Sequence, residues 1–231
     1  MMQTITVQRN ELKFYINYID YKVFHTILQN HLEQDTNAVK TNGYIRSLYF
    51  DTDDDRDYNE KQAGVLNRKK YRLRIYDMNT KKVKFEIKNK FNNQILKETA
   101  VITREDAIKI QNLDYEVLLK YNNPTLNKIY CAFKKFDYRP TVIVEYTREA
   151  FGIPFNNIRI TFDKNLKTCT NNLDLFSEDE IMKPLLPQGV LILEVKYNNY
   201  MPDWIKKLIQ IPRFEKSAIS KYCIGRIENY I

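Results

Sequence analysis

The stretch KVKFEIKNK, residues 82–90, decides the fold, because charged and apolar side chains alternate along its first seven residues. Successive side chains of a β-strand point to opposite faces of a sheet, so this alternation predicts a strand with one charged face and one apolar face. The preceding stretch RKKYRLRIY, residues 68–76, repeats the pattern, with Arg and Lys on one face and Tyr71, Leu73 and Ile75 on the other. It is therefore expected to form a second strand of the same two-faced kind.

Similar alternation recurs along most of the chain. It occurs at residues 9–16, 44–50, 95–102, 141–148, 158–163 and 190–197. Amphipathic stretches typical of helices separate these segments and begin near Asp20, Thr103, Pro124, Asp203 and Ser217. This order of about eight strands and several helices is typical of an α+β fold with a mostly antiparallel sheet, and a length of 231 residues favours one domain over residues 1–231.

The charged strand faces carry Arg, Lys and Glu rather than Thr, Ser and Gln. For any single strand, the alternative is an antiparallel sheet with one face in water. The helices carry apolar stripes, however, and these need the apolar strand faces. About eight strands can close into a barrel. Helices packed outside would then leave the charged faces inside, where the confined cations repel one another unless they bind a polyanion.

The amino-acid composition indicates the charge of the ligand and the kind of cellular compartment. The net charge of +8, from 37 Lys and Arg against 29 Asp and Glu, favours an anionic partner. Only 5 glycines occur, which excludes a Gly-rich phosphate loop. The widely spaced Cys131, Cys169 and Cys223 argue against a disulfide framework or a zinc site and favour a reducing, cytoplasmic compartment. We expect no signal peptide and no membrane-spanning segment.

Eight short motifs follow one another along the chain. They are RNELKF (9–14), SLYFDT (47–52), RKKYRLR (68–74), EIKNK (86–90), EYTREAF (145–151), RITFD (159–163), LEVKY (193–197) and SKY (220–222). This ordered set resembles the VTC-type polyphosphate polymerase domain, within the CYTH-like triphosphate tunnel metalloenzymes, over roughly residues 9–222. The resemblance implies an eight-stranded antiparallel β tunnel with helices packed outside. It also implies transfer of the ATP γ-phosphate to a growing inorganic polyphosphate chain with Mn²⁺ or Mg²⁺.

The same resemblance implies roles for individual residues. The cations that match the family's phosphate-contacting, catalytic positions are Lys13, Arg72, Arg74, Lys88, Arg148, Arg159, Lys196 and Lys221. Further substrate contacts are expected from Ser220, Lys90, Lys97, Glu86 and Glu11, and the metal-binding carboxylate from Glu194. Phosphoryl transfer depends on positioning and charge neutralisation, so a set of cations and one carboxylate suits it without a covalent nucleophile.

Two other functions stay open, namely a tunnel triphosphatase or related nucleotide-processing enzyme, and a non-catalytic polyphosphate or nucleotide binder. The Ser220-Lys221-Tyr222 motif favours the polymerase, and Glu194 argues against a mere binder. ATP and polyphosphate are the expected ligands. Nucleic acid is not expected, because the cations follow strand alternation rather than exposed aromatic platforms. Eukaryotic relatives add a sensor domain and a transmembrane tail, which we do not expect here. A separate membrane protein stays open as a partner.

The acidic stretch DTDDDRD, residues 51–57, resembles the start of a calcium-binding EF-hand loop. Its sixth position is Arg56, where that loop needs glycine, and its twelfth is Gln62 rather than glutamate. We therefore expect an acidic loop at the end of a strand. His25 and His31 lie six residues apart in a helical stretch and are expected to be structural.

Overall fold

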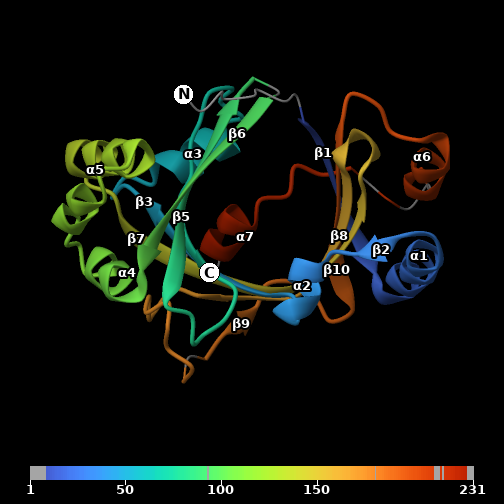
Figure 1. Cartoon of the computed structure of the whole chain (residues 1–231), viewed down its shortest axis with the longest axis horizontal. Helices are drawn as coiled ribbons and strands as arrows, with labels where there is room; N and C mark the ends of the chain where they lie inside the picture. The colour runs from blue at the N-terminus through green and yellow to red at the C-terminus, as the bar shows by residue number, and fades with distance from the viewer. Residues whose placement is uncertain (1–8, 93, 180, 211–213, 215, 228–231) are drawn as a thin grey trace. The chain divides into compact units, whose positions relative to one another are not determined.

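The computed structural model describes residues 9–92, 94–179, 181–210, 214 and 216–227 (Figure 1). The chain divides into two compact units. Unit 1 comprises residues 1–44, 146–166 and 186–219, and unit 2 comprises residues 45–145, 167–185 and 220–231. Strands β7 (Arg139–Ile153) and β8 (Ile158–Cys169) each contribute residues to both units. The expectation of one domain over residues 1–231 stays a prediction.

All eight expected strands are present. Besides β7 and β8 they are β1 (Arg9–Asn17), β3 (Tyr44–Asp51), β4 (Tyr71–Ile75), β5 (Lys82–Phe91), β6 (Gln94–Thr103) and β10 (Val190–Asn198). Two further strands, β2 (Glu33–Gln34) and β9 (Lys183–Pro184), are too short to show any alternation. Every strand pair whose register is described is antiparallel. The fold is therefore α+β with an antiparallel sheet, as expected, but the described residues form ten strands rather than eight.

The strand order is β1-β10-β8-β7-β3-β4-β5-β6, with β2 paired to β7 and β9 paired to β8. This path ends at β1 and at β6, so backbone hydrogen bonds do not close the described strands into a barrel. Strand β4 is also shorter than the expected 68–76. Lys70 still exchanges two backbone hydrogen bonds with Lys88, at 2.9 and 3.0 Å, so the pairing with β5 continues before β4 begins.

In unit 2 the helices cover the apolar strand faces. These helices are α4 (Arg104–Gln111), the 3-10 turn η1 (Glu116–Tyr121) and α5 (Pro124–Phe136). The Phe133 ring of α5 lies 5.2 Å from the ring of Tyr71 on β4 and 5.7 Å from that of Phe85 on β5. The Thr103 side chain accepts a hydrogen bond from the Asp106 N–H and caps α4, whose start the sequence predicts near Thr103. Helices on the apolar face leave the charged face of β4 and β5 for polar contacts.

In unit 1 the same arrangement uses α1 (Tyr18–His31) and α6 (Asp203–Ile209). Phe24 of α1 packs edge-on against Phe162 of β8, with ring centroids 6.4 Å apart. The sequence places the start of this helix near Asp20, but α1 begins at Tyr18, and Asp20 is not its cap. Asn17, the extended last residue of β1, accepts the Asp20 N–H at 2.8 Å, because the helix begins directly where the strand ends. His25 and His31 both lie on α1.

Four short elements complete the described chain. They are α2 (Thr36–Lys40), α3 (Arg56–Gln62), the 3-10 turn η2 (Phe155–Asn157) and α7 (Lys221–Ile227). Helix α3 begins inside the expected acidic loop. Helix α7 begins at Lys221 rather than near Ser217, because the Ser217 N–H donates to the Lys13 carbonyl at 2.9 Å and keeps that segment on β1. Among the described helices, none has both the length and the apolar character that crossing a membrane requires.

Candidate active site

The register of unit 2 brings charged residues of β4 and β5 and polar residues of β3 onto one face. Arg72 of β4 lies opposite Tyr49 of β3 and opposite Glu86 of β5. Arg74 lies opposite Ser47 and Lys84 in the same way. Directly opposed residues of an antiparallel pair project from the same face. The register therefore joins the polar faces of the neighbouring strands β3, β4 and β5 into one polar face of the sheet.

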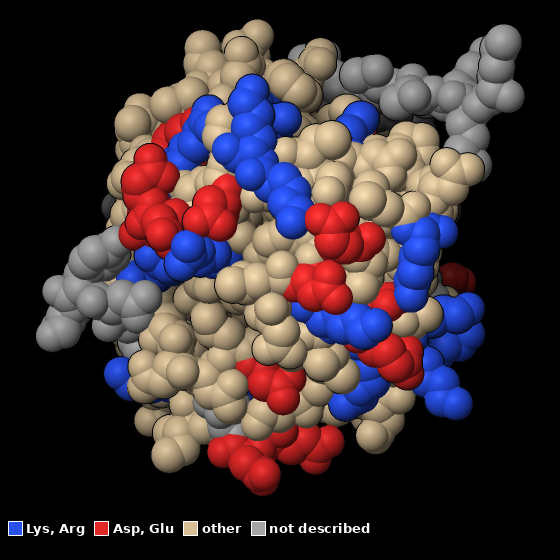
Figure 2. All heavy atoms as spheres, turned by 90° about the vertical axis from the view of Figure 1, so that its left-hand side faces the viewer, with Lys and Arg blue, Asp and Glu red and all other residues tan. Residues whose placement is uncertain are grey.

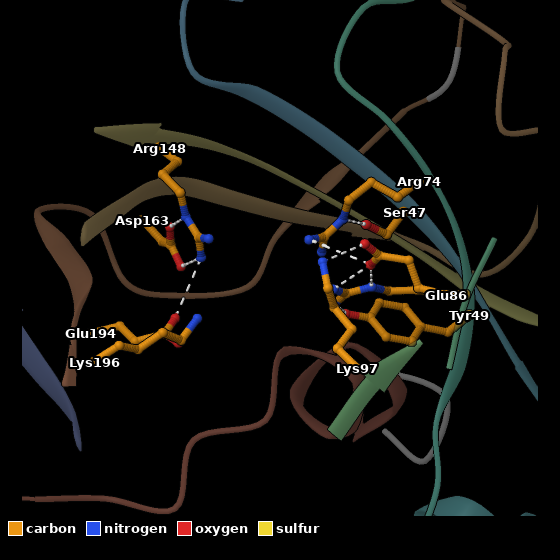
Figure 3. A network of polar contacts seen from close by, with 10 residues as sticks. Ser47, Tyr49, Arg74, Glu86, Lys97, Arg148, Asp163, Glu194 and Lys196 are labelled. Carbon is orange, nitrogen blue, oxygen red and sulfur yellow. Dashed lines mark hydrogen bonds and ion pairs between the residues drawn. The ribbon is translucent and has the colours of Figure 1, made fainter. Parts of the chain in front are cut away.

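Glu86 is the centre of the polar cluster in unit 2 and is only 1% exposed (Figure 3). Its carboxylate lies 2.7 Å from the Arg72 guanidinium, 3.0 Å from Lys97 Nζ and 4.0 Å from Arg74 Nη1. Burial favours the neutral acid, but Arg72, Arg74 and Lys97 outweigh it and lower the pKa of Glu86 to about 2. A single ionised carboxylate therefore holds three cations that were all expected in the site.

Two residues of β3 join this cluster, and sequence reasoning missed both. Arg72 Nη1 donates to the Tyr49 hydroxyl at 3.1 Å, and Arg74 Nε donates to Ser47 Oγ at 2.9 Å. Burial raises the pKa of Tyr49, but the charges of Arg72 and Arg74 overcome this and lower it to about 8. Strand β3 is buried on both faces rather than on one, so the alternation expected over residues 44–50 does not identify Tyr49 as a site residue.

Lysines continue the charged face beyond Glu86. Lys88 of β5 lies directly opposite Lys97 of β6, and Lys90 follows on the same face. Like charges directly opposite each other on a sheet are unfavourable in water. They become favourable next to an anion, so this row suits a phosphate-rich ligand better than a structural role.

The SKY motif lies at the start of α7 in unit 2. Lys70 Nζ donates to Ser220 Oγ at 2.6 Å and lies 5.0 Å from the centre of the Tyr222 ring. Ser220 Oγ also accepts the Cys223 N–H at 3.3 Å, which caps α7, and Lys221 is its first residue. Lys70 was not among the expected site residues, although its position two residues before Arg72 gives it the same strand parity.

In unit 1 the corresponding centre is Glu194 of β10, which is 3% exposed (Figure 3). Lys196 Nζ lies 2.6 Å from its Oε1, and Arg148 Nη2 lies 3.4 Å from its Oε2. Lys13 is paired in register with Glu194 and forms an ion pair with Glu11 at 2.9 Å. Burial raises the pKa of Glu194, but Lys196 and Lys13 outweigh it and hold that pKa well below its usual range.

A second buried carboxylate, Asp163, orients Arg148 and was not an expected site residue. Arg148 Nε and Nη2 contact the two Asp163 oxygens at 2.6 and 2.7 Å. The backbone N–H of Arg148 donates to the backbone carbonyl of Gly43 at 2.8 Å. Gly43 has φ +68, and a Cβ there would lie 2.1 Å from the Arg148 carbonyl oxygen. Position 43 therefore requires glycine, because only glycine allows this close approach.

Arg159 does not contact the carboxylate of Glu194. It lies opposite Lys196 in register, but its side chain is 44% exposed and pairs with Asp35 at 2.7 Å. Its expected role in phosphate binding stays a prediction.

The carboxylates of unit 1 fit a hard divalent cation in part. Glu11 lies within hydrogen-bonding reach of the Glu194 carboxylate, and carboxylate oxygens are the ligands that a hard divalent cation prefers. Within the described ranges, however, no group of three or more His, Cys, Asp or Glu side chains could hold a metal by itself. A divalent ion at Glu194 therefore needs further oxygen ligands, which phosphates can supply.

The family model for the VTC domain matches residues 8–228. The chain belongs to the VTC domain family. A search of the curated proteins finds no match. This VTC domain shares its fold with a putative adenylyl cyclase from Hippeastrum described as having a dominant triphosphatase activity, at 13% identity and a TM-score of 0.54, covering 94% of this chain and 95% of that one.

Two other solved structures resemble this VTC domain less closely. A putative adenylate cyclase from Bacillus halodurans has 13% identity and a TM-score of 0.46, with 88% of each chain covered. A protein from Pyrococcus horikoshii OT3 has 15% identity and a TM-score of 0.47, with 96% of this chain and 99% of that chain covered. At 13% identity, the likeness to the Hippeastrum structure concerns the fold alone. The roles of individual residues stay predictions.

Proposed function

We propose that this VTC domain is a polyphosphate polymerase that transfers the γ-phosphoryl group of ATP to the end of an inorganic polyphosphate chain. Family membership supports a triphosphate-processing enzyme. The finer proposal rests on Arg72 and Arg74, which are fixed on one strand face. On the neighbouring strands, Lys88 of β5 and Lys97 of β6 lie opposite each other and extend this row of cations. Such a row offers successive positive charges to successive phosphates of a chain.

Fixed guanidinium groups can stabilise the transferring phosphoryl group. Arg72 is oriented by Glu86 and Tyr49 before any substrate arrives, and Arg74 is oriented by Ser47. Donors held in place in this way need no reorganisation as charge develops on the phosphoryl oxygens. The bond from the γ-phosphorus to the β–γ bridging oxygen breaks, a bond to a terminal polyphosphate oxygen forms, and ADP leaves.

The residues of unit 1 provide for charge neutralisation. Glu194 and Glu11 would hold Mn²⁺ or Mg²⁺, which when bound would neutralise charge on phosphate oxygens. Arg148 is held on Asp163 and Lys196 on Glu194, so both cations have defined positions beside the proposed metal ligands before a ligand binds. The terminal phosphate oxygen attacks as an anion, and no side chain has to remove a proton from it.

A triphosphatase is the second candidate, and a specific observation favours it. The structure from Hippeastrum that shares this fold is described as having a dominant triphosphatase activity. In that reaction water would take the place of the polyphosphate end as acceptor. The same cations would bind the triphosphate, so the acceptor alone separates the two functions.

Purified protein incubated with ATP and Mn²⁺, with products separated on a polyphosphate gel, tests the proposal. A ladder of lengthening chains with release of ADP is expected. Release of free phosphate without a ladder would establish the triphosphatase instead. Binding of tripolyphosphate without turnover would identify a binder. Addition of EDTA should abolish the ladder.

We also propose a cytoplasmic location and no nucleic-acid partner. Figure 2 shows the side bearing α4 and α5, where Lys and Arg are interspersed with Asp and Glu. Ion pairs such as Lys128–Glu98 at 2.6 Å and Lys134–Glu116 at 2.9 Å neutralise this surface. On this side, Asp and Glu lie beside and between the Lys and Arg side chains, unlike a surface of a single positive sign that attracts a nucleic-acid backbone.

A further inference from the structure

Asp51, the last residue of β3, is a completely buried carboxylate that the proposed reaction does not use. Its Oδ1 accepts the N–H groups of Thr52 and Asp57, each at 2.8 Å, and its Oδ2 accepts the Tyr58 N–H at 2.9 Å. Asp51 therefore ties the end of β3 to the first turn of α3. A buried carboxylate is stable only with such a set of donors.

The fourth donor to Asp51 comes from the SKY motif. The Tyr222 hydroxyl of α7 donates to Asp51 Oδ2, 171 residues away in sequence. Burial and the Asp51 charge raise the pKa of Tyr222, so this hydroxyl keeps its proton and remains a donor. The Tyr222 ring also packs against Tyr49, with centroids 5.3 Å apart. One side chain of α7 is thereby connected to the strand that supports Arg72.

The rest of α7 fits closely into unit 2. A Cβ at Gly225 would lie 3.0 Å from Thr168 Oγ1 and 3.2 Å from a methyl group of Val142. Arg226 forms an ion pair with Asp55, next to the start of α3. The helix is therefore attached at both of its ends, by Tyr222 to Asp51 and by Arg226 to Asp55.

We propose that Asp51 is a positioning residue for phosphate binding, acting through Tyr222 to hold Ser220 and Lys70 in place. The contact between Lys70 Nζ and Ser220 Oγ exists only while α7 stays on the end of β3. Asp51 itself touches no ligand. This inference rests on the proposed function, since it assumes that the SKY motif binds phosphate.

A purely stabilising role for the Asp51–Tyr222 contact predicts a different outcome. Tyr138 provides a matched control, because its buried hydroxyl also donates to a buried carboxylate of unit 2, Asp57 Oδ1 at 3.0 Å. No described contact links Tyr138 to α7. If the contact only stabilises the fold, Tyr222→Phe and Tyr138→Phe should both lower the melting temperature. Both variants should then bind phosphate as tightly as the unchanged chain.

Titration calorimetry of the full chain with tripolyphosphate in EDTA measures binding without turnover. We expect Tyr222→Phe and Ser220→Ala each to weaken binding by about three- to tenfold, and the double variant to bind within twofold of Ser220→Ala. That lack of additivity is expected when one residue acts through the other. Tyr138→Phe should bind within twofold of the unchanged chain.

The possible outcomes separate the inference from the proposed function. Unchanged binding in Tyr222→Phe, while Arg72→Ala abolishes binding, would overturn the positioning role and leave the function intact. Unchanged binding in Arg72→Ala would overturn the function itself. Fully additive losses in the double variant would overturn the route through Ser220. If Tyr222→Phe does not fold, Asp55→Asn loosens the same helix from its other end and is judged by the same criteria.

Discussion

The two ion-pair clusters differ in how their charge is balanced. In unit 2 the single carboxylate of Glu86 faces three cations, namely Arg72, Arg74 and Lys97. The cluster therefore carries surplus positive charge on rigid strands. Surplus charge of this kind in a partly buried site is unfavourable until an anion enters, so the cluster of unit 2 is built to receive phosphate.

In unit 1 acids and bases are nearly matched. Asp163 and Glu194 contact Arg148, Glu194 also contacts Lys196, and the Lys13–Glu11 ion pair adds one charge of each sign. The cations of this cluster are already satisfied. Its carboxylates are then the groups that a divalent ion can use, which suits a role in charge neutralisation rather than in phosphate capture. The difference predicts that matched substitutions in the two units will affect different steps.

Glu194→Gln should give the largest effect on catalysis. Loss of the metal-binding carboxylate is expected to lower Mn²⁺-dependent turnover by about 100-fold or more, since metal neutralisation contributes several kcal/mol to the transition state. Tripolyphosphate binding in EDTA should stay within about threefold, because the cations of unit 2 are unchanged. Turnover within about tenfold, together with a modestly lower melting temperature, would mean that Glu194 is only a salt-bridge partner.

Gly43→Ala should give the largest effect on stability. The added Cβ would meet the Arg148 carbonyl oxygen at 2.1 Å and would also strain a residue with φ +68. We expect a loss of about 2–4 kcal/mol in unfolding free energy, a range typical of a severe steric clash. The matched control is Gly64→Ala, which has φ +72 but no atom within 4 Å of its Cβ and should cost only about 1 kcal/mol. Equal losses in thermal denaturation would contradict the clash.

Arg72→Lys sharpens the comparison from the side of unit 2. Lysine keeps the charge but loses the planar fork that contacts Glu86 and Tyr49 together. We expect kcat/KM for ATP to fall by about 10- to 50-fold, or about 1.4–2.3 kcal/mol of transition-state stabilisation. The loss should include weaker tripolyphosphate binding, unlike that of Glu194→Gln. Identical behaviour of the two variants in the binding titration would remove the division of roles between the clusters.

The strands and their faces could be predicted because alternation is a local property. The residues 82–90 show the pattern directly, and the structure buries Val83, Phe85 and Ile87 under helices as that pattern requires. Ten strands rather than eight follow from β2 and β9, which have only two residues each. Whether the path closes depends on long-range pairing, and no local pattern carries that information.

The candidate site was less predictable from composition and alternation. Tyr49 and Asp51 lie on a strand that is buried on both faces, so the alternation expected over residues 44–50 does not distinguish either side chain. Asp163 alternates correctly, but nothing in the sequence distinguishes a carboxylate that orients Arg148 from one that faces water. Lys70 lies on the same strand face as Arg72 and Arg74. It could have been predicted by including every charged residue of that face within residues 68–76.

A comparison of two buried carboxylates within unit 2 supplies the smallest expected effect. Glu86 has three cationic neighbours and a lowered pKa, whereas Asp57 is 2% exposed and its Oδ2 has no hydrogen-bond partner among the described residues. Burial, and next the charge of Asp51, raise the pKa of Asp57 to about 8, although the hydrogen bond from Tyr138 opposes this. Asp57 is therefore expected to be protonated in the folded protein at neutral pH.

This pKa sets the sign of a pH effect on stability. The unfolded chain loses the Asp57 proton near pH 4, whereas the folded chain keeps it until about pH 8, so unfolding releases a proton between these values. The contribution of Asp57 to the free energy of unfolding is complete below pH 4 and is lost as the pH rises toward 8. Asp57→Asn removes this dependence while an amide oxygen can still accept from Tyr138. Chemical denaturation at pH 5 and pH 8 gives the unfolding free energy of both proteins. The value for the variant minus that for the unchanged chain should be higher at pH 8 than at pH 5 by at least about 1 kcal/mol. A difference that stays constant, or shrinks, would show that Asp57 is ionised in the folded state and that its environment resembles that of Glu86 after all.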